Sequence, residues 1–388
     1  MGSVQSFETP KSRGGRPGKI DAPLNKKLSE VKWGEYRLGD LFEVNSYTKR
    51  FDANKVIVLE DGKYPYVVRM SNNNGQKGYI DEDEIYLNEG NTISFGQDTA
   101  TMFYQEHPYF TGDKIKILKA KFREFDKSNA QFFLTTMAKS FESFSWGRSS
   151  FSVDIIEKQI ISLPVKDGTI DFDFISSFIA ELEAERIKEL EAYLTVAGLK
   201  NYILTEEEHS VLDSYVDWKW NTFNLEDLFG KSTRGKRLKS ADRIPGELPF
   251  VTAGEADEGI SDFIGNDVDI FSENTTTIDM FGSAKYRNYK YGGDDHVAVV
   301  HTETLPKLAS IFVTSAIHKS SHSGQFDYSK NFYAKDADAL NIQLPSRNGH
   351  PDYDCMITFI SAIQKIVIKD VVLFADRKIE VAKEFVRK

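Results

Sequence analysis

Basic and amide side chains are concentrated in a few short segments of this chain of 388 residues. Residues 231–239 hold five bases and no acid, and residues 285–290 hold three bases with two tyrosines. Lysine and arginine beside Gly, Ser and Thr can bind phosphate oxygens, while Asn, Gln and Arg can hydrogen-bond the edges of bases. These segments predict contact with DNA through Lys49, Arg50, Arg69, Asn72, Asn73, Asn74, Gln97, Arg148, Ser149, Lys231, Arg234, Lys236, Arg237, Lys285, Arg287, Lys290 and Gln325.

Plainer interpretations compete with this prediction. The basic runs could be ordinary solvated loops. The run Asn72–Gln76 is equally typical of a tight turn that needs positive φ. Binding is favoured because Lys-Arg occurs twice, as Lys49-Arg50 and Lys236-Arg237, at the same point of an internal repeat.

Motifs for catalysis are missing from the sequence. It has no Gly-x-Gly-x-x-Gly fingerprint and no P-loop, and without a Pro-Pro pair it lacks the Asn/Asp-Pro-Pro-aromatic signature of amino-methyltransferases. His318 and His322 have the spacing of two metal ligands on one helix face, but the three residues between them include no acid of the zinc-protease type. We expect polar surface histidines there.

The C-terminal segment offers two further patterns. Asp352 together with residues 376–378 resembles a nuclease pattern, but we expect these residues on a helix, whereas nuclease carboxylates lie on adjoining strands. Cys355 falls on an apolar helix face and is expected to pack rather than react. The sequence therefore predicts no catalytic site, and no metal or cofactor bound by this chain.

The net charge of −10, from 49 Lys+Arg and 59 Asp+Glu, would by itself argue against a nucleic-acid partner. However, residues 171–208 contain ten acids and three bases, which leaves a net −3 for the rest of the chain. The total charge therefore does not exclude DNA. With one cysteine, no long apolar run and no apolar leader after Met1, we expect a cytoplasmic protein without disulfides.

A tandem repeat organises the chain. Trp33-Gly-Glu-Tyr-Arg-Leu-Gly-Asp-Leu-Phe42 matches Trp220-Asn-Thr-Phe-Asn-Leu-Glu-Asp-Leu-Phe229 at an offset of 187. Further matches keep the same order while the offset falls to 181 at Leu163-Pro164 and Leu344-Pro345. The chain is therefore a duplication.

Each repeat has short β-type runs with helices, followed by a long helix that begins at an Asp-aromatic-Asp sequence. We predict an α+β fold with two pseudo-symmetric heads of mixed β-sheet and helices. The expected parts are a basic flexible tail (1–32), a first head (33–170), a first long helix (171–200), an acidic connector (201–219), a second head (220–351) and a second long helix (352–388).

The two long helices carry apolar stripes wider than one head can cover. We expect the helices to pack antiparallel, as a spacer of about 40–50 Å at a rise of about 1.5 Å per residue. Their apolar residues are candidates for docking other subunits: Ile175, Ile179, Leu182, Leu190, Phe359, Ile363, Val367 and Phe374.

The duplicated opening Trp-x₄-Leu-x-Asp-Leu-Phe resembles that of the DNA specificity subunits of type I restriction–modification systems. So do the aromatic segments Phe144-Ser145-Trp146 and Phe326-Asp327-Tyr328, the Leu-Pro that follows each and the long helices. The start of each long helix also resembles the specificity subunits of type IIB enzymes. The resemblance covers residues 33–388.

The resemblance implies a non-catalytic subunit in which each head is a target recognition domain that reads one half of a bipartite sequence in double-stranded DNA. It also implies that the helices dock methyltransferase subunits, which bind S-adenosylmethionine, and in some systems a restriction subunit. The acidic connector departs from the family pattern. A pseudo-symmetric protein–protein scaffold that never contacts DNA remains the alternative.

Overall fold

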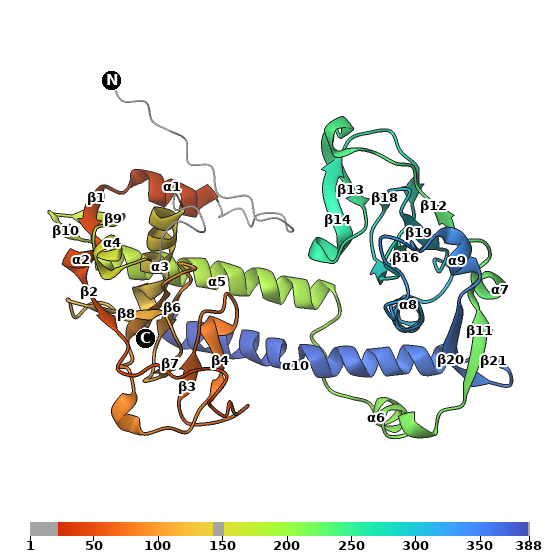
Figure 1. Ribbon diagram of the computed structural model, residues 1–388, viewed down its shortest axis with the longest axis horizontal. Helices are drawn as coiled ribbons and strands as arrows, with labels where there is room; N and C mark the ends of the chain where they lie inside the picture. The colour runs from red at the N-terminus through yellow and green to blue at the C-terminus, as the bar shows by residue number, and fades with distance from the viewer. Residues whose placement is uncertain (1–21, 143–150, 387–388) are drawn as a thin grey trace. The chain divides into compact units, whose positions relative to one another are not determined.

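The computed structural model describes residues 22–142 and 151–386 (Figure 1). These residues divide into two compact units, and the boundary falls between Glu189 and Leu190. We call them the first unit and the second unit. Each contains one head of the predicted duplication.

The first unit contains three sheets. One has the order β1-β9-β10 (Trp33–Arg37, Ile160–Lys166, Thr169–Ile170). Another has the order β2-β8-β5-β6 (Phe42–Ser46, Ile115–Ala120, Thr92–Gly96, Met102–Gln105). The last is β4-β3-β7 (Gln76–Tyr79, Pro65–Val67, Phe110–Thr111). Its helices are α1 (Ala22–Glu30), α2 (Leu38–Leu41), α3 (Lys127–Phe141), α4 (Val153–Glu157) and most of α5 (Phe172–Val196), with 3₁₀ turns η1 (Asn73–Gly75) and η2 (Glu84–Tyr86).

The second unit repeats these sheets. They are β11-β20-β21 (Trp220–Asn224, Asn341–Arg347, His350–Pro351), β12-β19-β16-β17 (Thr233–Arg234, Val297–Val300, Thr275–Asp279, Ala284–Arg287) and β14-β13-β18-β15 (Ile260–Ile264, Pro245–Val251, Tyr291–Gly293, Ile270–Phe271). Its helices are α6 (Glu206–Asp213), α7 (Leu225–Phe229), α8 (Lys307–Ser321), α9 (Ala334–Asp338) and α10 (Tyr353–Val386), with 3₁₀ turns η3 (Tyr215–Asp217), η4 (Ser240–Asp242) and η5 (Ala256–Gly259).

The strand registers confirm the duplication. Trp33 pairs with Pro164 in the first unit, and Trp220 pairs with Pro345 in the second. These are the tryptophans and the Leu-Pro segments that the sequence comparison aligned. The predicted α+β fold with two tandem heads is confirmed, and the third sheet of the second head has one strand more.

Each head packs a helix against its largest sheet. In the first head Phe42, Phe125 and Phe133 contact one another edge to face and form the centre of the core. In the second head smaller residues take this place, including Val313 and Ile317 of α8. The central strands β5, β16 and β19 are buried on both faces. Along β19, Ala298 and Val300 belong to this core while Val297 and Val299 belong to a second cluster, because side chains alternate along a strand.

The long helices begin where the sequence predicted. Asp171 accepts a hydrogen bond from the backbone N–H of Phe174, and Asp352 accepts one from Cys355, so each caps the first turn of its helix. Gly198, with φ 68°, ends the first helix. Within the second unit, Leu194 at the end of α5 packs against Val372 and Ala375 of α10, and all three are buried.

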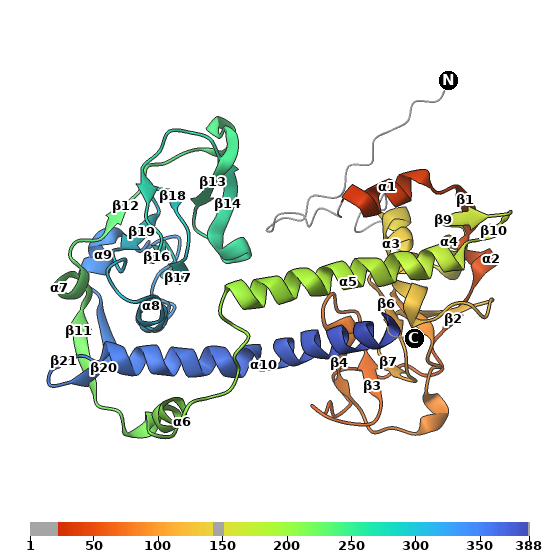
Figure 2. The same cartoon turned by 180° about the vertical axis from the view of Figure 1, so that it is seen from behind.

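Each repeat opens with a helix that the sequence analysis did not predict. In the first unit α1 buries Leu24 in the core, and Lys27 forms an ion pair of 2.5 Å with Glu181 of α5. In the second unit α6 places Glu208 2.7 Å from Lys365 of α10 (Figure 2). Residues 22–30 are thus not part of a flexible tail, and the acidic connector contains the opening helix of the second repeat. Residues 1–21 lie outside the described residues.

Candidate nucleic-acid interface

In the first head, four loops bring basic candidates together. Arg50, after β2, lies 3.0 Å from Asp113. Arg69, after β3, lies 2.5 Å from Asp98, which also accepts a hydrogen bond of 2.8 Å from Lys114. The carbonyl of Lys114 accepts a hydrogen bond from the N–H of Gln97. Lys49, Arg50, Arg69 and Gln97 therefore lie on adjoining loops.

These ion pairs hold the side chains of Arg50 and Arg69 in place, but they leave both able to bind another partner. The hydrogen bond to Asp113 raises the pKa of Arg50, so its guanidinium stays charged. The side chain of Arg50 is 63% exposed, and ion pairs in contact with solvent contribute little to stability. A phosphate group can therefore replace the carboxylate partner. Lys49 lies over the ring of Tyr86, 4.0 Å from its centre.

The run Asn72–Gly75 forms a tight turn with positive φ, which was one of the two interpretations of this sequence. Asn73 and Asn74 have φ of 47° and 53°, and their amide nitrogens donate hydrogen bonds to the carbonyls of Gln76 and Tyr104. All three asparagines are exposed. A contact with bases stays a prediction for them. Arg148 and Ser149 lie outside the described residues.

In the second head, four of the predicted DNA-contact residues lie in or beside β12, and all four are exposed: Lys231, Arg234, Lys236 and Arg237. Lys236 and Arg237 follow β12, which pairs with β19, just as Lys49 and Arg50 follow β2, which pairs with β8. Lys236 is 87% exposed and lies 3.3 Å from Asp269. The recurrence of Lys-Arg at equivalent places is therefore a feature of the structure as well as of the sequence.

The structure does not support Arg287 as a contact residue. Its side chain is buried, at 1% exposure, and donates hydrogen bonds to the hydroxyls of Thr277 and Tyr289 and to the carbonyl of Glu258. The sequence suggested an exposed basic run, but Arg287 points into the head because it lies on the inner side of β17. Lys285 is 15% exposed and pairs with Glu255 and Asp279. Lys290 and Gln325 are exposed.

The residues weighed for catalysis have other roles. His318 accepts a hydrogen bond from the N–H of Ala284, and His322 contacts the carbonyl of Phe281 through Nδ1. Burial raises the pKa of Cys355 to about 11, which leaves the thiol protonated at neutral pH. Asp352 caps α10 and pairs with Arg347 at 2.8 Å.

The docking candidates separate into two groups. Ile175 and Ile179 are buried in the first-unit core, so the prediction that they dock a partner is wrong. The helical spacing of Ile175 and Ile179 reflects packing within their own unit. Leu182 packs on the same core, Leu190 packs beside Leu194, and Phe359 stacks on Tyr215 with ring centres 5.4 Å apart.

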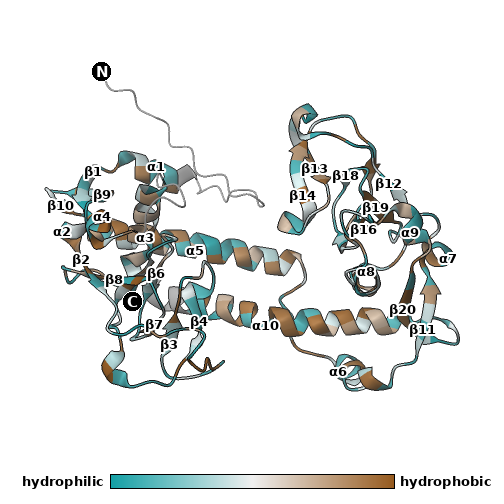
Figure 3. Cartoon of the chain, viewed as in Figure 1, coloured by the Kyte–Doolittle hydropathy of each residue, from teal (hydrophilic) through white to brown (hydrophobic). Residues whose placement is uncertain are grey.

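The docking candidates whose side chains are exposed lie along α10. Val367 and Phe374 are 71% and 45% exposed, and Ile366 and Val371, which were not among the candidates, are 49% and 38% exposed. Ile363 is half-buried. We call Ile363, Ile366, Val367, Val371 and Phe374 the α10 stripe. Much of the ribbon of α10 has the colour of hydrophobic residues in Figure 3. By helical spacing the exposed Asp370 lies on the same face as this stripe, whereas the exposed Lys369 lies beside it.

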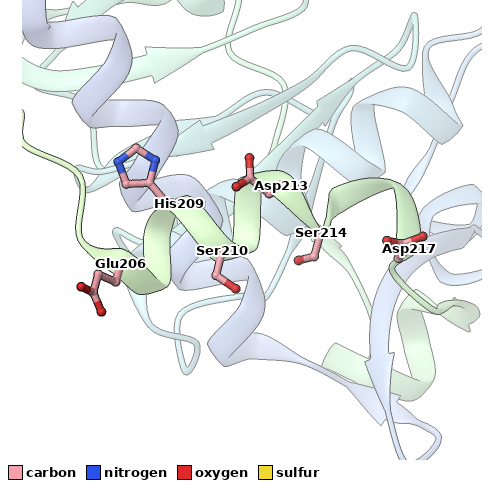
Figure 4. Close-up of a pocket in the computed structure, with 6 residues that line it drawn as sticks. All are labelled: Glu206, His209, Ser210, Asp213, Ser214 and Asp217. Atoms are coloured by element: carbon pink, nitrogen blue, oxygen red, sulfur yellow. The ribbon is translucent and has the colours of Figure 1, made fainter.

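An open hollow runs along α6 and the turn that follows it (Figure 4). It is lined by Glu206, His209, Ser210, Asp213, Ser214 and Asp217 and has a volume of about 640 Å³. These side chains are polar and mostly exposed. The hollow lacks the apolar walls that enclose a small ligand.

Comparisons with known proteins agree with this architecture. Residues 30–192 match the family model of the type I restriction modification DNA specificity domain. The specificity subunit S.BcgI of a type II restriction enzyme from Heyndrickxia coagulans is 25% identical over 345 residues, which are 87% of this chain and 96% of that protein. The crystal structure of the S subunit of a type I restriction–modification system from M. genitalium aligns with a TM-score of 0.55 at 14% identity, over 92% of this chain and 94% of that one.

Two heads of repeated topology, each followed by a long helix, make up this fold, which is similar to that of the S subunit from M. genitalium. Residues 30–192, in the first repeat, match the DNA specificity domain of type I restriction–modification systems, and 87% of the chain is similar to a specificity subunit of a restriction enzyme. The similarity to a specificity subunit agrees with the prediction of a non-catalytic subunit. In the described part of the chain, no helix is long and apolar enough to span a bilayer.

Proposed function

We propose that the two heads read the two halves of a bipartite DNA target while the long helices dock methyltransferase subunits. One observation carries the bipartite target: the heads share their topology but differ in the side chains that their loops present. Arg50, Arg69 and Lys114 cluster in the first head. In the second head Arg237 takes the place of Arg50, but the loop that corresponds to the one with Lys114 holds Asp294, Asp295 and His296. Different loops on the same scaffold favour different half-sites.

The α10 stripe supports the docking function. Monomeric proteins rarely expose several large apolar side chains in one row, and such rows mark interfaces. We expect the methyltransferase subunits to bind S-adenosylmethionine and to supply the chemistry, with this chain working in the cytoplasm beside the DNA. A restriction subunit is a further expected partner in some systems.

The test uses the full chain purified with its methyltransferase partner. The complex is incubated with a randomised DNA library, and methylated sites are identified by sequencing. We expect two conserved sequence blocks separated by a gap of fixed length. Methylation without sequence preference would refute recognition, whereas one continuous block would refute the bipartite target alone. The rival function, a scaffold without DNA contact, predicts that omitting this chain leaves the preference unchanged.

A further inference from the structure

Each head contains a turn in which two consecutive residues with a Cβ have positive φ. These are Asn73 and Asn74, at 47° and 53°, and Asp257 and Glu258, at 51° and 55°. This backbone conformation is unfavourable for such residues and is kept where the surroundings fix it. The sequence analysis missed the second turn, although residues 256–259 align with residues 72–75 at the repeat offset of 184.

The two turns occupy the same place in the fold. Each follows the strand, β3 or β13, that pairs in parallel with a short neighbour. Each ends in a glycine, Gly75 or Gly259, whose carbonyl accepts a hydrogen bond of 2.8 Å from the chain just before the turn. We call Asn72–Gly75 and Ala256–Gly259 the reading turns.

A buried polar side chain supports each reading turn from a neighbouring strand. Gln105, 4% exposed, donates a hydrogen bond of 3.1 Å to the carbonyl of Asn74. Arg287, 1% exposed, donates one of 2.8 Å to the carbonyl of Glu258. Gln105 and Arg287 hold equivalent positions, since they pair across the sheet with Thr92 and Thr275.

Burying the charged side chain of Arg287 costs free energy. A buried charge normally requires an ion partner, yet in the described part of the chain Arg287 makes no ion pair; neutral oxygens accept its hydrogen bonds, and its guanidinium lies over the ring of Tyr291, 5.9 Å from the ring centre. What the side chain does achieve is to fix the backbone of an exposed turn, as Gln105 does in the other head.

The reading turns offer hydrogen-bond acceptors. In the first head the amide nitrogens of Asn73 and Asn74 are used within the head, while their Oδ1 atoms have no partner among the described residues. In the second head the exposed carboxylates of Asp257 and Glu258 make no hydrogen bond or ion pair within the described ranges. In the major groove, acceptors of this kind suit the exocyclic amino groups of adenine and cytosine.

We propose that the reading turns contact base edges and read adenine or cytosine through these acceptors, with Gln105 and Arg287 as positioning residues. The proposal rests on the proposed function of the heads. Carboxylates are repelled by phosphates, so Asp257 and Glu258 fit a base edge rather than the DNA backbone. Basic side chains that can bind the adjoining phosphates lie near both turns. Arg69 precedes the first turn, and Lys285 pairs with Glu255 beside the second.

The experiment compares two matched double variants in the full complex: Asn73→Gly with Asn74→Gly, and Asp257→Gly with Glu258→Gly. Glycine adopts positive φ without strain, so the backbone conformation stays allowed. The Asn73/Asn74 variant also loses the hydrogen bonds to Gln76 and Tyr104, whereas the Asp257/Glu258 variant loses no hydrogen bond or ion pair within the described ranges. Each variant should lose base preference about tenfold at one or two positions of its own half-site, because one good base contact is worth about that much. The other half-site should stay unchanged. Glu247→Gln, an exposed acid on β13, serves as the control.

A third variant, Arg287→Gln, tests positioning. It should broaden preference at the same positions as the Asp257/Glu258 variant, whereas a purely structural residue would lower methylation at all sites equally. Melting curves identify any variant that fails to fold. If both double variants keep the wild-type preference at every position, the reading turns do not contact bases. If the wild-type complex has no preference at all, the proposed function fails instead.

Discussion

Lys285, Arg287 and Lys290 come from one basic run but lie in three environments. Lys290 is exposed, Lys285 is mostly covered and paired with two acids, and Arg287 is buried. The sequence predicted all three as DNA contacts, because charge alone does not show which side of a strand faces the core. Strand alternation places Arg287 inward. The recurring Lys-Arg pair was predicted better, since its position in a repeat adds information about the fold.

The exposed pair Lys236 and Arg237 leads to a prediction about salt. Replacing both by alanine should weaken DNA binding and make log Kd less dependent on log salt concentration, with the slope falling by about 1 for each lost phosphate contact. Binding is measured by titration at several salt concentrations. Lys307→Ala with Lys319→Ala, two exposed bases of α8, is the matched control. An unchanged slope in the Lys236/Arg237 variant would exclude this loop from the interface.

Glu208 leads to a prediction about pH. Burial alone would raise its pKa, but hydrogen bonds from Lys365, Ser361 and the backbone of Thr205 outweigh burial and lower it below the ordinary 4.5. A lowered pKa means that the charged carboxylate stabilises the fold above pH 4.5, and that this contribution disappears as pH falls through the native pKa. Thermal unfolding followed by tryptophan fluorescence should show this loss in the wild-type protein and not in Glu208→Gln.

A variant of Lys365, the ion-pair partner of Glu208, tests how much the pair contributes to the free energy of unfolding. Lys365→Met leaves the carboxylate of Glu208 buried without its cation, so at pH 7 we expect a loss of about 3 kcal/mol. Lys369→Met removes an exposed lysine from the same helix and should change stability by less than about 0.5 kcal/mol. Equal stability of the Lys365 and Lys369 variants would show that the ion pair does not hold α6 on α10.

At the scale of elements, local signals predicted the long helices well. The sequence indicated long helices within 171–200 and 352–388, and the structure has Phe172–Val196 and Tyr353–Val386. The capping aspartates and Gly198 act within one turn of the chain, so they can be recognised in sequence. By contrast, α1 has few apolar residues, and the contacts of Leu24 and Leu28 with the core stabilise it. Contacts between distant residues leave no local pattern, and α1 was missed for that reason.

The α10 stripe leads to a prediction at the same scale. Val367→Asp should leave melting unchanged, because the side chain is 71% exposed, but should weaken binding of the methyltransferase subunit at least tenfold, because a partner would bury the new charge. Lys369→Asp places the same residue outside the stripe and is the control. Affinity is measured by titration of the purified subunits. Full affinity in the Val367 variant would mean that the partner docks elsewhere.

At the scale of the whole molecule, the duplication was the strongest inference from sequence, because ordered matches along 388 residues depend on no single side chain. It also places the opening helices: α1 and α6 each precede the first strand of a head and each form an ion pair with the long helix of their own unit. The acidic residues of the connector therefore belong to a repeat, and Glu208 is fixed by Lys365. Under the proposed function, we expect the length of α5 to set the gap between the two half-sites.

Deleting residues 183–189 from α5 tests that link. Seven residues are two helical turns, so the apolar face keeps its direction while the helix shortens by about 10 Å. At about 3.4 Å per base pair the gap between half-sites should shrink by about three base pairs. The gap is measured by sequencing methylated DNA from the randomised library. Replacing residues 183–189 by seven other helix-forming residues keeps the length and should keep the gap. A deletion variant that is folded and active with the wild-type gap would show that α5 does not set the spacing.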